Sequence, residues 1–254
     1  MSLALSACII TLNEEKNIER CILSLNLANE IILLDSGSID KTIEIAKKFS
    51  KVKIFHRNFD NYIDQKNHCI SLAQNDWVLV LDADESLSPE LEKEIFQNFD
   101  NTNYNGFYFP RLTHYLGKWI YHGGWYPNYQ LKLFRKSKGK FAGMLVHEKV
   151  ELEGNIFKLK NPIYHFSYEN IEDHIRYINK YSTLHAEERF QRGKKSSILY
   201  SLGKGFYKFF YMYMIKLGFL DGRAGLIIAT LGAFYNFLKY AKLAEKQLKK
   251  NNTI

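Results

Sequence analysis

Residues 77–86 read WVLVLDADES, an apolar run that ends in two aspartates separated by one alanine. An uninterrupted run of this kind is typical of a strand that is buried on both faces of a parallel sheet. Three similar runs precede it, at residues 3–10, 31–34 and 52–55, and helical patterns lie between them. This order predicts a β-α-β-α-β-α-β arrangement with helices on both faces of the sheet. Ligands bind such sheets beyond the carboxyl ends of the strands, so we expect functional residues there.

The two halves of the chain have different patterns. We expect the first helices to begin after Asn13 and Asp40, which are candidate N-caps. Beyond residue 100 the pattern changes to short strands separated by glycine and aromatic residues, and then to a long helix. The strands are predicted at residues 106–112, 130–134, 145–150 and 163–167, and the helix from Ile171 to about Arg192. The sequence therefore predicts one mixed α/β domain over residues 1–168 and a helical region over residues 169–254.

Composition restricts the class of protein. The chain has 254 residues, of which 46% are hydrophobic and 24% are charged, close to the values of an average globular domain. Its three cysteines, Cys8, Cys21 and Cys69, have no CxxC spacing, which argues against a disulfide framework and against a zinc finger. The N-terminal apolar stretch has no positively charged region before it, so we do not expect a secretion signal. These features together favour a cytoplasmic location.

Positive charge is concentrated at the C-terminus. From Arg189 onward the chain has 13 Lys or Arg and two acidic residues, a net charge of +11, whereas the preceding part carries −3. Aromatic and aliphatic residues alternate with these lysines, which favours an anionic membrane surface as partner over nucleic acid. The alternative is a basic helix that packs on the body of the protein. The longest uncharged run, residues 224–238, is shorter than the roughly 20 residues of a spanning helix, so we expect peripheral binding.

Several polar residues follow the predicted strands. Asp82 and Asp84 are two residues apart, so both carboxylates can reach one cation, although a solvated turn is the alternative. Hard oxygen ligands suit Mg²⁺ or Mn²⁺, and substrate phosphates commonly complete such a site. Asp35 can accept hydrogen bonds from a base or a ribose, or can form an Asx turn with Ser36-Gly37-Ser38. Lys66 precedes the fourth strand, where it can meet a diphosphate or remain in solvent.

Four ordered blocks carry a resemblance to a known family. They are CIITLNEE at residues 8–15, LLDSGSIDKT at 33–42, DQKNHC at 64–69 and WVLVLDADES at 77–86. Together they resemble the inverting glycosyltransferases of family 2, which have the GT-A fold. The later segments YPNYQLKLFRK, VHEKV, NPIYHFSY and GFLDGRAG are similar to a branch that contains lipopolysaccharide-core β-1,4-glucosyltransferases. The resemblance implies a Rossmann-like mixed sheet flanked by helices, with a nucleotide-sugar-binding half over residues 1–100 and an acceptor-side half over residues 101–168.

The resemblance also implies roles for individual residues. The positions that hold the nucleotide sugar correspond to Thr11, Asn13, Asp35, Lys66 and Asp82. The metal ligands correspond to Asp84, Asp82 and His165, and the catalytic base corresponds to Glu148. Where the family often has an aspartate pair in the second block, this chain has Asp35 alone. Without the resemblance, Glu148 also fits a strand residue that faces solvent, and His165 a core histidine.

The resemblance also implies an activity. We expect a metal-dependent inverting transferase that moves a hexose, from UDP-glucose, onto a lipid-linked glycan such as the inner core of a lipopolysaccharide or lipooligosaccharide. Attack on an anomeric carbon needs a carboxylate that deprotonates the acceptor hydroxyl. A divalent cation, Mg²⁺ or Mn²⁺, offsets the charge of the leaving diphosphate. The acceptor's lipid places the enzyme at the inner face of the cytoplasmic membrane.

Other interpretations remain open at this point. Aspartyl phosphatases also use a DxD motif, but they generally have it after the first strand. A sugar-nucleotide-binding or glycan-binding module of the same fold would retain these residues without turnover. Trp125 can stack on a sugar ring or lie buried beside a turn, and Arg135 can meet an acceptor phosphate or brace a loop.

Overall fold

The computed structural model describes residues 3–100, 103–144 and 147–251. The chain divides into two compact units. Unit 1 consists of the residues up to Leu112 together with Asn128–Phe166, and unit 2 consists of Thr113–Pro127 and the residues from Ser167 onward. The segment Thr113–Pro127 therefore belongs with the C-terminal helices, although in the sequence it lies between two segments of unit 1.

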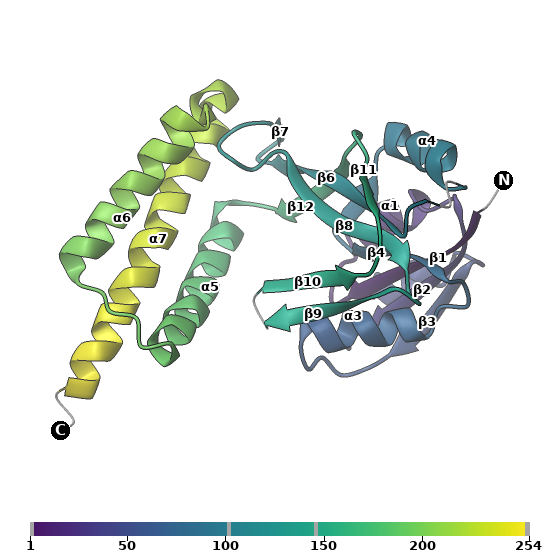
Figure 1. Ribbon diagram of the computed structural model, residues 1–254, viewed down its shortest axis with the longest axis horizontal. Helices are drawn as coiled ribbons and strands as arrows, with labels where there is room; N and C mark the ends of the chain where they lie inside the picture. Colours follow the sequence, from purple (N-terminus) through teal and green to yellow (C-terminus); the bar gives the residue numbers. More distant parts are fainter. Residues whose placement is uncertain (1–2, 101–102, 145–146, 252–254) are drawn as a thin grey trace. The chain divides into compact units, whose positions relative to one another are not determined.

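Unit 1 is built on a mixed sheet in which four neighbouring strands are parallel and the next strand, β8, is antiparallel (Figure 1). In sheet order the strands are β3 (Val52–His56), β2 (Ala28–Asp35), β1 (Leu3–Thr11), β4 (Trp77–Asp82), β8 (Asn128–Arg135), β6 (Gly106–Tyr115), β12 (Ile163–Tyr168) and β5 (Glu85–Leu87). The short strands β7 (Lys118–Ile120) and β11 (Ile156–Lys158) pair with β6, and β9 (Gly139–Met144) and β10 (His147–Leu152) form a separate hairpin. The predicted mixed α/β class is confirmed; of the strand predicted at 145–150, Leu145 and Val146 lie outside the described residues.

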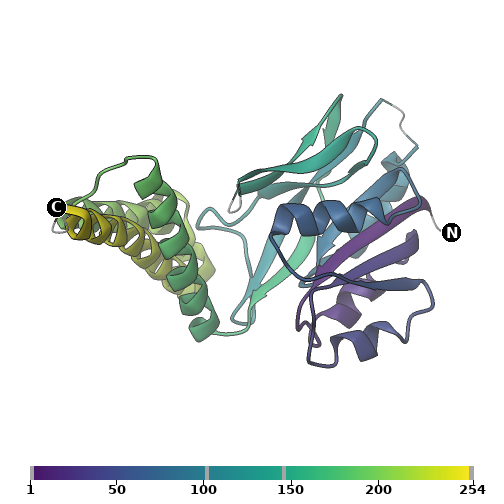
Figure 2. The same cartoon turned by 90° about the horizontal axis from the view of Figure 1, so that it is seen from below.

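Helices cover both faces of this sheet. They are α1 (Ile18–Leu23), α2 (Thr42–Ala46), α3 (Tyr62–Ser71) and α4 (Pro89–Asn98). Alternate residues of the central strand β1 point to opposite faces, as the period of two in a strand requires. Leu5, Ala7 and Ile9 pack in one core with residues of α1, α2 and α4. Cys8 and Ile10 pack in a second core with α3 and the β9–β10 hairpin (Figure 2).

The parallel register brings the carboxyl ends of the strands to one edge of the sheet. Thr11 lies opposite Asp35, Asp35 lies opposite His56, and Ile10 lies opposite Asp82. The polar segments that follow these strands consequently share that edge. This is where the sequence predicted the functional residues.

Unit 2 contains three long helices that lie side by side (Figures 1 and 2). They are α5 (Ile171–Gln191), α6 (Ile198–Phe210) and α7 (Gly222–Asn251), and α7 contacts both of the others. A π-helical turn, Tyr211–Ile215, and a 3₁₀ turn, Gly218–Asp221, join α6 to α7. A side chain is excluded at Gly225, because a Cβ there would lie 1.8 Å from the carbonyl oxygen of Gly218.

One helical stretch in the described part of the chain, Gly218–Lys249, is long and apolar enough to cross a membrane by length and composition alone. The apolar window within it is 28% buried. Its partners include α5 and α6, so part of its apolar surface packs inside unit 2.

Candidate active site

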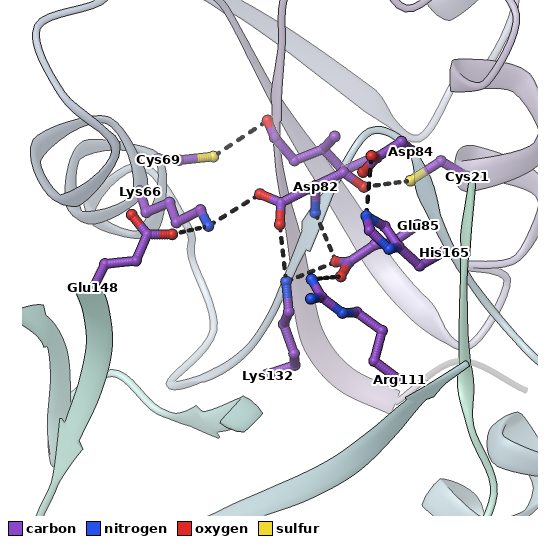
Figure 3. A network of polar contacts seen from close by, with 11 residues as sticks. Cys21, Lys66, Cys69, Asp82, Asp84, Glu85, Arg111, Lys132, Glu148 and His165 are labelled. Carbon is purple, nitrogen blue, oxygen red and sulfur yellow. Dashed lines mark hydrogen bonds and ion pairs between the residues drawn. The ribbon is translucent and has the colours of Figure 1, made fainter. Parts of the chain in front are cut away.

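The turn that follows β4 carries the two aspartates of the DxD motif. β12 lies beside this turn, because the backbone N–H of Phe166 donates to the carbonyl oxygen of Asp84 at 2.9 Å and His165 lies opposite Glu85. The imidazole Nε2 of His165 is 3.2 Å from the carboxylate Oδ2 of Asp84 (Figure 3). The fold thus places the predicted metal residues Asp84 and His165 next to each other, although 80 residues separate them in the sequence.

The carboxylate of Asp82 lies between two lysines (Figure 3). Its Oδ1 is 3.0 Å from Nζ of Lys66, and its Oδ2 is 3.1 Å from Nζ of Lys132. Burial by itself raises the pKa of Asp82, but the charges of Lys132 and Lys66 outweigh this effect and hold the pKa well below its usual range. Asp82 is therefore a carboxylate at any physiological pH.

Glu85 holds the DxD turn in shape through a hydrogen bond to its backbone. Its side chain is fully buried, and its Oε2 accepts hydrogen bonds from the backbone N–H of Asp82 at 3.0 Å and from Lys132 at 2.6 Å. Arg111 is 3.8 Å from its other oxygen. Burying a carboxylate is costly unless it is paired and hydrogen-bonded. Glu85 meets both conditions through Oε2, whereas its buried Oε1 has no hydrogen-bond partner among the described residues.

The sequence motifs indicate no role for Lys132 or Glu85. The available signal was Lys132 itself, since it stands between Leu131 and Leu133 inside a strand that is otherwise apolar. A lysine in that position is almost never buried unless it is paired. The structure identifies the pair, because Lys132 bridges Asp82 and Glu85.

Glu148 reaches the same group of charges from the β9–β10 hairpin. Its Oε1 accepts a hydrogen bond from Nζ of Lys66 at 2.5 Å, while its Oε2 is buried and has no hydrogen-bond partner among the residues that the structure describes. Asn67, next to Lys66 on α3, holds the hairpin in place through two 2.9 Å hydrogen bonds to the backbone of Phe141. Glu148 is thus not a solvent-facing strand residue, and one of its oxygens is available to a ligand.

Lys66 links the two acidic groups through a single ammonium. Its side chain is 5% exposed, and it contacts both Asp82 and Glu148. Burial lowers the pKa of Lys66, but the two carboxylates outweigh burial and raise the pKa above its ordinary value. Lys66 is therefore always charged in this position. We call Lys66, Asp82, Glu85, Lys132 and Glu148 the charged cluster.

The remaining predicted residues form a rim at the ends of β1 and β2. Asp35 adopts the Asx turn, accepting hydrogen bonds from the backbone N–H groups of Gly37 and Ser38 at 3.0 and 3.1 Å. Asn13 has a left-handed backbone with φ of +57°, and its Oδ1 accepts a hydrogen bond from the N–H of Ile39 at 2.9 Å. The hydroxyl of Thr11 is buried and has no hydrogen-bond partner in the described ranges, so it could bond to a ligand.

The residues present fit a divalent cation only in part. Asp84 and His165 offer one carboxylate and one imidazole, a donor pair that suits Mn²⁺ or Mg²⁺ when substrate phosphates supply further ligands. Within residues 3–100, 103–144 and 147–251, no three His, Cys, Asp or Glu side chains converge as a metal site. A metal here would therefore depend on the donor's own oxygen atoms.

Trp125 and Arg135 both pack against other side chains. Trp125 belongs to unit 2, where its ring centroid is 5.6 Å from that of Tyr115 and 6.0 Å from that of His174. Arg135 lies 3.2 Å from Asp76 and stacks over the ring of Trp77. These contacts favour packing for Trp125 and a bracing role for Arg135.

Known proteins with a similar sequence identify the family of this chain. The family model for glycosyl transferase family 2 matches residues 6–149. An uncharacterized glycosyltransferase of Rickettsia conorii is 33% identical, over 98% of this chain and 93% of that protein. The lipopolysaccharide core biosynthesis glycosyltransferase LpsC of Rhizobium meliloti is 30% identical, over 96% of this chain and 93% of that protein.

Solved structures with a similar course of the chain include that of S. aureus TarS 1-349 in complex with UDP-GlcNAc. It has a TM-score of 0.49 and 14% sequence identity, and the alignment covers 99% of this chain and 92% of that one. The family-model match and the two relatives, which span almost the whole length of the chain, are sufficient to assign it. The chain belongs to glycosyltransferase family 2 and is a glycosyltransferase.

Proposed function

We propose that this glycosyltransferase moves a hexose from a UDP-sugar, UDP-glucose in the first instance, onto a lipid-linked glycan such as a lipopolysaccharide or lipooligosaccharide inner core. The observation that carries the proposal is the pair of contacts made by Lys66, which joins Glu148 to Asp82 of the DxD motif. A base and a donor-binding carboxylate then lie within reach of one ammonium group. The relative LpsC, a lipopolysaccharide core biosynthesis glycosyltransferase, supports the choice of acceptor.

The proposed chemistry is a single displacement with inversion. Oε2 of Glu148 accepts the proton of an acceptor hydroxyl. At the same time the hydroxyl oxygen of the acceptor bonds to the anomeric carbon, and the bond between that carbon and the UDP oxygen breaks. Lys66 holds Oε1 and so orients the carboxylate. Asp82 and the rim residues Thr11, Asn13 and Asp35 bind the nucleotide sugar, and Asp84 and His165 would hold Mg²⁺ or Mn²⁺. When bound, this cation offsets the charge that the leaving diphosphate gains.

The proposed acceptor carries a lipid, so the enzyme would work at a membrane. We place it at the inner face of the cytoplasmic membrane as a peripheral protein, with an anionic lipid surface as its partner. The basic and aromatic sequence from Arg189 onward supports this assignment.

The first test replaces the proposed base. We expect Glu148→Gln to lower transfer about 10²- to 10⁴-fold, the usual contribution of a general base, while UDP-glucose still binds. Glu151→Gln is the matched control, because Glu151 lies on the same strand and is exposed. Transfer is measured as UDP released with a lipooligosaccharide acceptor, and binding is measured by calorimetry. Unchanged transfer in Glu148→Gln would contradict the base assignment.

The second test concerns the metal. We expect UDP release to need Mn²⁺ or Mg²⁺, to stop with EDTA and to be lost in Asp84→Asn, whereas Asp60→Asn, a change at an exposed aspartate, has no effect. A panel of UDP-sugars identifies the donor, and the anomeric configuration of the product shows whether the reaction inverts. If no UDP-sugar binds with or without metal, a glycan-binding module becomes the better explanation. Turnover in EDTA would remove the metal from the mechanism.

A further inference from the structure

α6 carries an apolar stripe that is exposed among the residues that the structure describes. Its members are spaced three or four residues apart and point away from α7, along one side of α6 and the π-helical turn that continues it. Leu199 is 80% exposed and Phe206 is 75% exposed, and contiguous exposed apolar residues of this kind mark interaction sites. The stripe consists of Leu199, Leu202, Phe206, Phe210 and Met214.

The opposite face of α6 explains why the stripe points outward. Ser201 and Gly205 are buried on that face. A Cβ on Gly205 would lie 3.3 Å from the carbonyl oxygen of Ala233 and 3.3 Å from the Cβ of Phe237, both on α7. The small residues thus let α6 approach α7 closely, and the large apolar residues remain on the outer side.

The segment of the sequence that carries the stripe is strongly basic. Between residues 192 and 223 there are seven basic residues and one acid, Asp221. Asp221 is buried and accepts hydrogen bonds from the backbone N–H and imidazole of His122 at 2.8 and 3.0 Å. Its charge is therefore not exposed to a docking partner. The basic residues are Arg192, Lys194, Lys195, Lys204, Lys208, Lys216 and Arg223.

We propose that the α6 stripe and the basic residues beside it form the surface that docks on an anionic lipid bilayer. Apolar side chains on one helix face enter the boundary between headgroups and acyl chains, and lysines bind the anionic headgroups. A second copy of the chain is a poorer occupant, because a twofold contact through the same patch sets basic residues against basic residues. The inference deepens the proposed function, since it names the surface that brings the enzyme to a lipid-linked acceptor.

The inference assigns membrane contact to α6 and not to α7. α7 packs against both α5 and α6, whereas the stripe lies on the outer side of α6. Binding through α6 is therefore peripheral and reversible. A spanning α7 would instead keep the protein in the membrane at high salt and at alkaline pH.

The first experiment uses the full chain and vesicles of phosphatidylcholine, with or without one quarter phosphatidylglycerol. We expect cosedimentation with the anionic vesicles only, and release by 0.5 M NaCl. The double variant Leu199→Gln/Phe206→Gln should lose at least tenfold in partitioning. Leu184→Gln, a change at an exposed leucine of α5, is the matched control and should bind as the wild type does.

A second variant tests the charge. Lys194→Gln/Lys195→Gln removes two exposed lysines before α6, and a loss of about fivefold per lysine is expected on anionic vesicles. Lys47→Gln/Lys48→Gln removes two exposed lysines of unit 1 and should change nothing. Equal binding to neutral and anionic vesicles would overturn the role of the basic residues.

Three outcomes overturn the inference as a whole. They are full vesicle binding by Leu199→Gln/Phe206→Gln, retention of the wild type on vesicles in 0.5 M NaCl, and a wild-type dimer that this variant dissociates in analytical ultracentrifugation. UDP-sugar hydrolysis in solution separates the inference from the proposed function. We expect the double variant to hydrolyse the donor as the wild type does. If the wild type binds vesicles but acts on no UDP-sugar, the docking surface stands and the proposed function fails.

Discussion

Units 1 and 2 bury titratable groups in opposite ways. In unit 1 the charged cluster pairs its buried lysines with carboxylates: Lys132 bridges Asp82 and Glu85, and Lys66 bridges Asp82 and Glu148. In unit 2 the buried histidine stays neutral: His174 stacks on Tyr168 at 4.3 Å, and its Nδ1 lies 2.9 Å from the hydroxyl of Tyr115. Burial lowers the pKa of His174 to about 4 and raises that of Tyr115 to about 12.

The two units differ in how their buried polar groups contribute to stability. Buried ions contribute little to stability relative to apolar residues of the same volume, but they become strongly destabilising when one partner is removed. The members of the charged cluster therefore add little to stability as pairs, and a charged ligand could replace one partner of a pair. The aromatic cluster of unit 2, formed by Tyr115, Trp125, Tyr168 and His174, gains its stability from packed apolar area instead.

The largest effect is expected from Lys132→Met. This change leaves the fully buried Glu85 and one oxygen of Asp82 without their ammonium partner, which should lower the free energy of unfolding by about 3–5 kcal/mol. Urea unfolding followed by circular dichroism measures it. Lys149→Met is the control, because Lys149 and Glu151 are both exposed and lie 3.6 Å apart. This pair should contribute at most about 1 kcal/mol to the free energy of unfolding. Equal losses in the two variants would remove the distinction between buried and exposed pairs.

A smaller effect is expected from acid acting on the aromatic cluster. Because the pKa of His174 is about 4 in the folded state and about 6.5 in the unfolded state, the unfolded chain binds more protons between these values. The contribution of neutral His174 is complete above pH 6.5 and falls as the pH drops, by about 2 kcal/mol at pH 5. Thermal unfolding at pH 7.5 and 5 measures it. His174→Phe should reduce this pH dependence and His68→Gln should not; an unchanged dependence in His174→Phe would assign it to other groups.

The smallest effect is expected at the surface of unit 1. Arg57 and Asp60 form an ion pair at 3.1 Å, and Asp60 is mostly exposed. Asp60→Asn should change the free energy of unfolding by less than about 0.5 kcal/mol, because solvent screens such pairs. Urea unfolding in low and high salt checks this value. A loss comparable to that of Lys132→Met would mean that pairing matters here regardless of burial.

The strands of unit 1 could be predicted because their apolar runs have a short, local signature. The helix starts were less accurate: α1 begins at Ile18 after Asn17, not directly after Asn13. Asn13 instead bonds to the loop that follows β2, a contact between segments 26 residues apart that no local pattern reveals. The same reason explains why Thr113–Pro127 could not be assigned to unit 2 from the sequence.

The site was predictable to the extent that its residues lie at strand ends. Asp82 and Asp84 form a motif, and the resemblance selected Lys66, Glu148 and His165, which the fold brings into the neighbourhood of that motif. Their pairing could not be predicted, because it depends on distances between β4, β8, α3 and β10. Lys132 and Glu85 were missed for that reason, since a buried ion pair is a property of two segments and not of either one.

The loops after β1 and β2 are bonded to each other as well as to themselves. The N–H of Asn13 donates to Oγ of Ser38 at 2.9 Å, that of Glu14 to Oγ1 of Thr42 at 2.7 Å, and that of Glu15 to Oδ2 of Asp40 at 3.0 Å. This edge of the sheet therefore has its shape without a bound ligand. A donor that binds there would meet a preorganised surface and lose little affinity to loop ordering. The two loops lose their conformational entropy when the protein folds, and not each time a ligand binds.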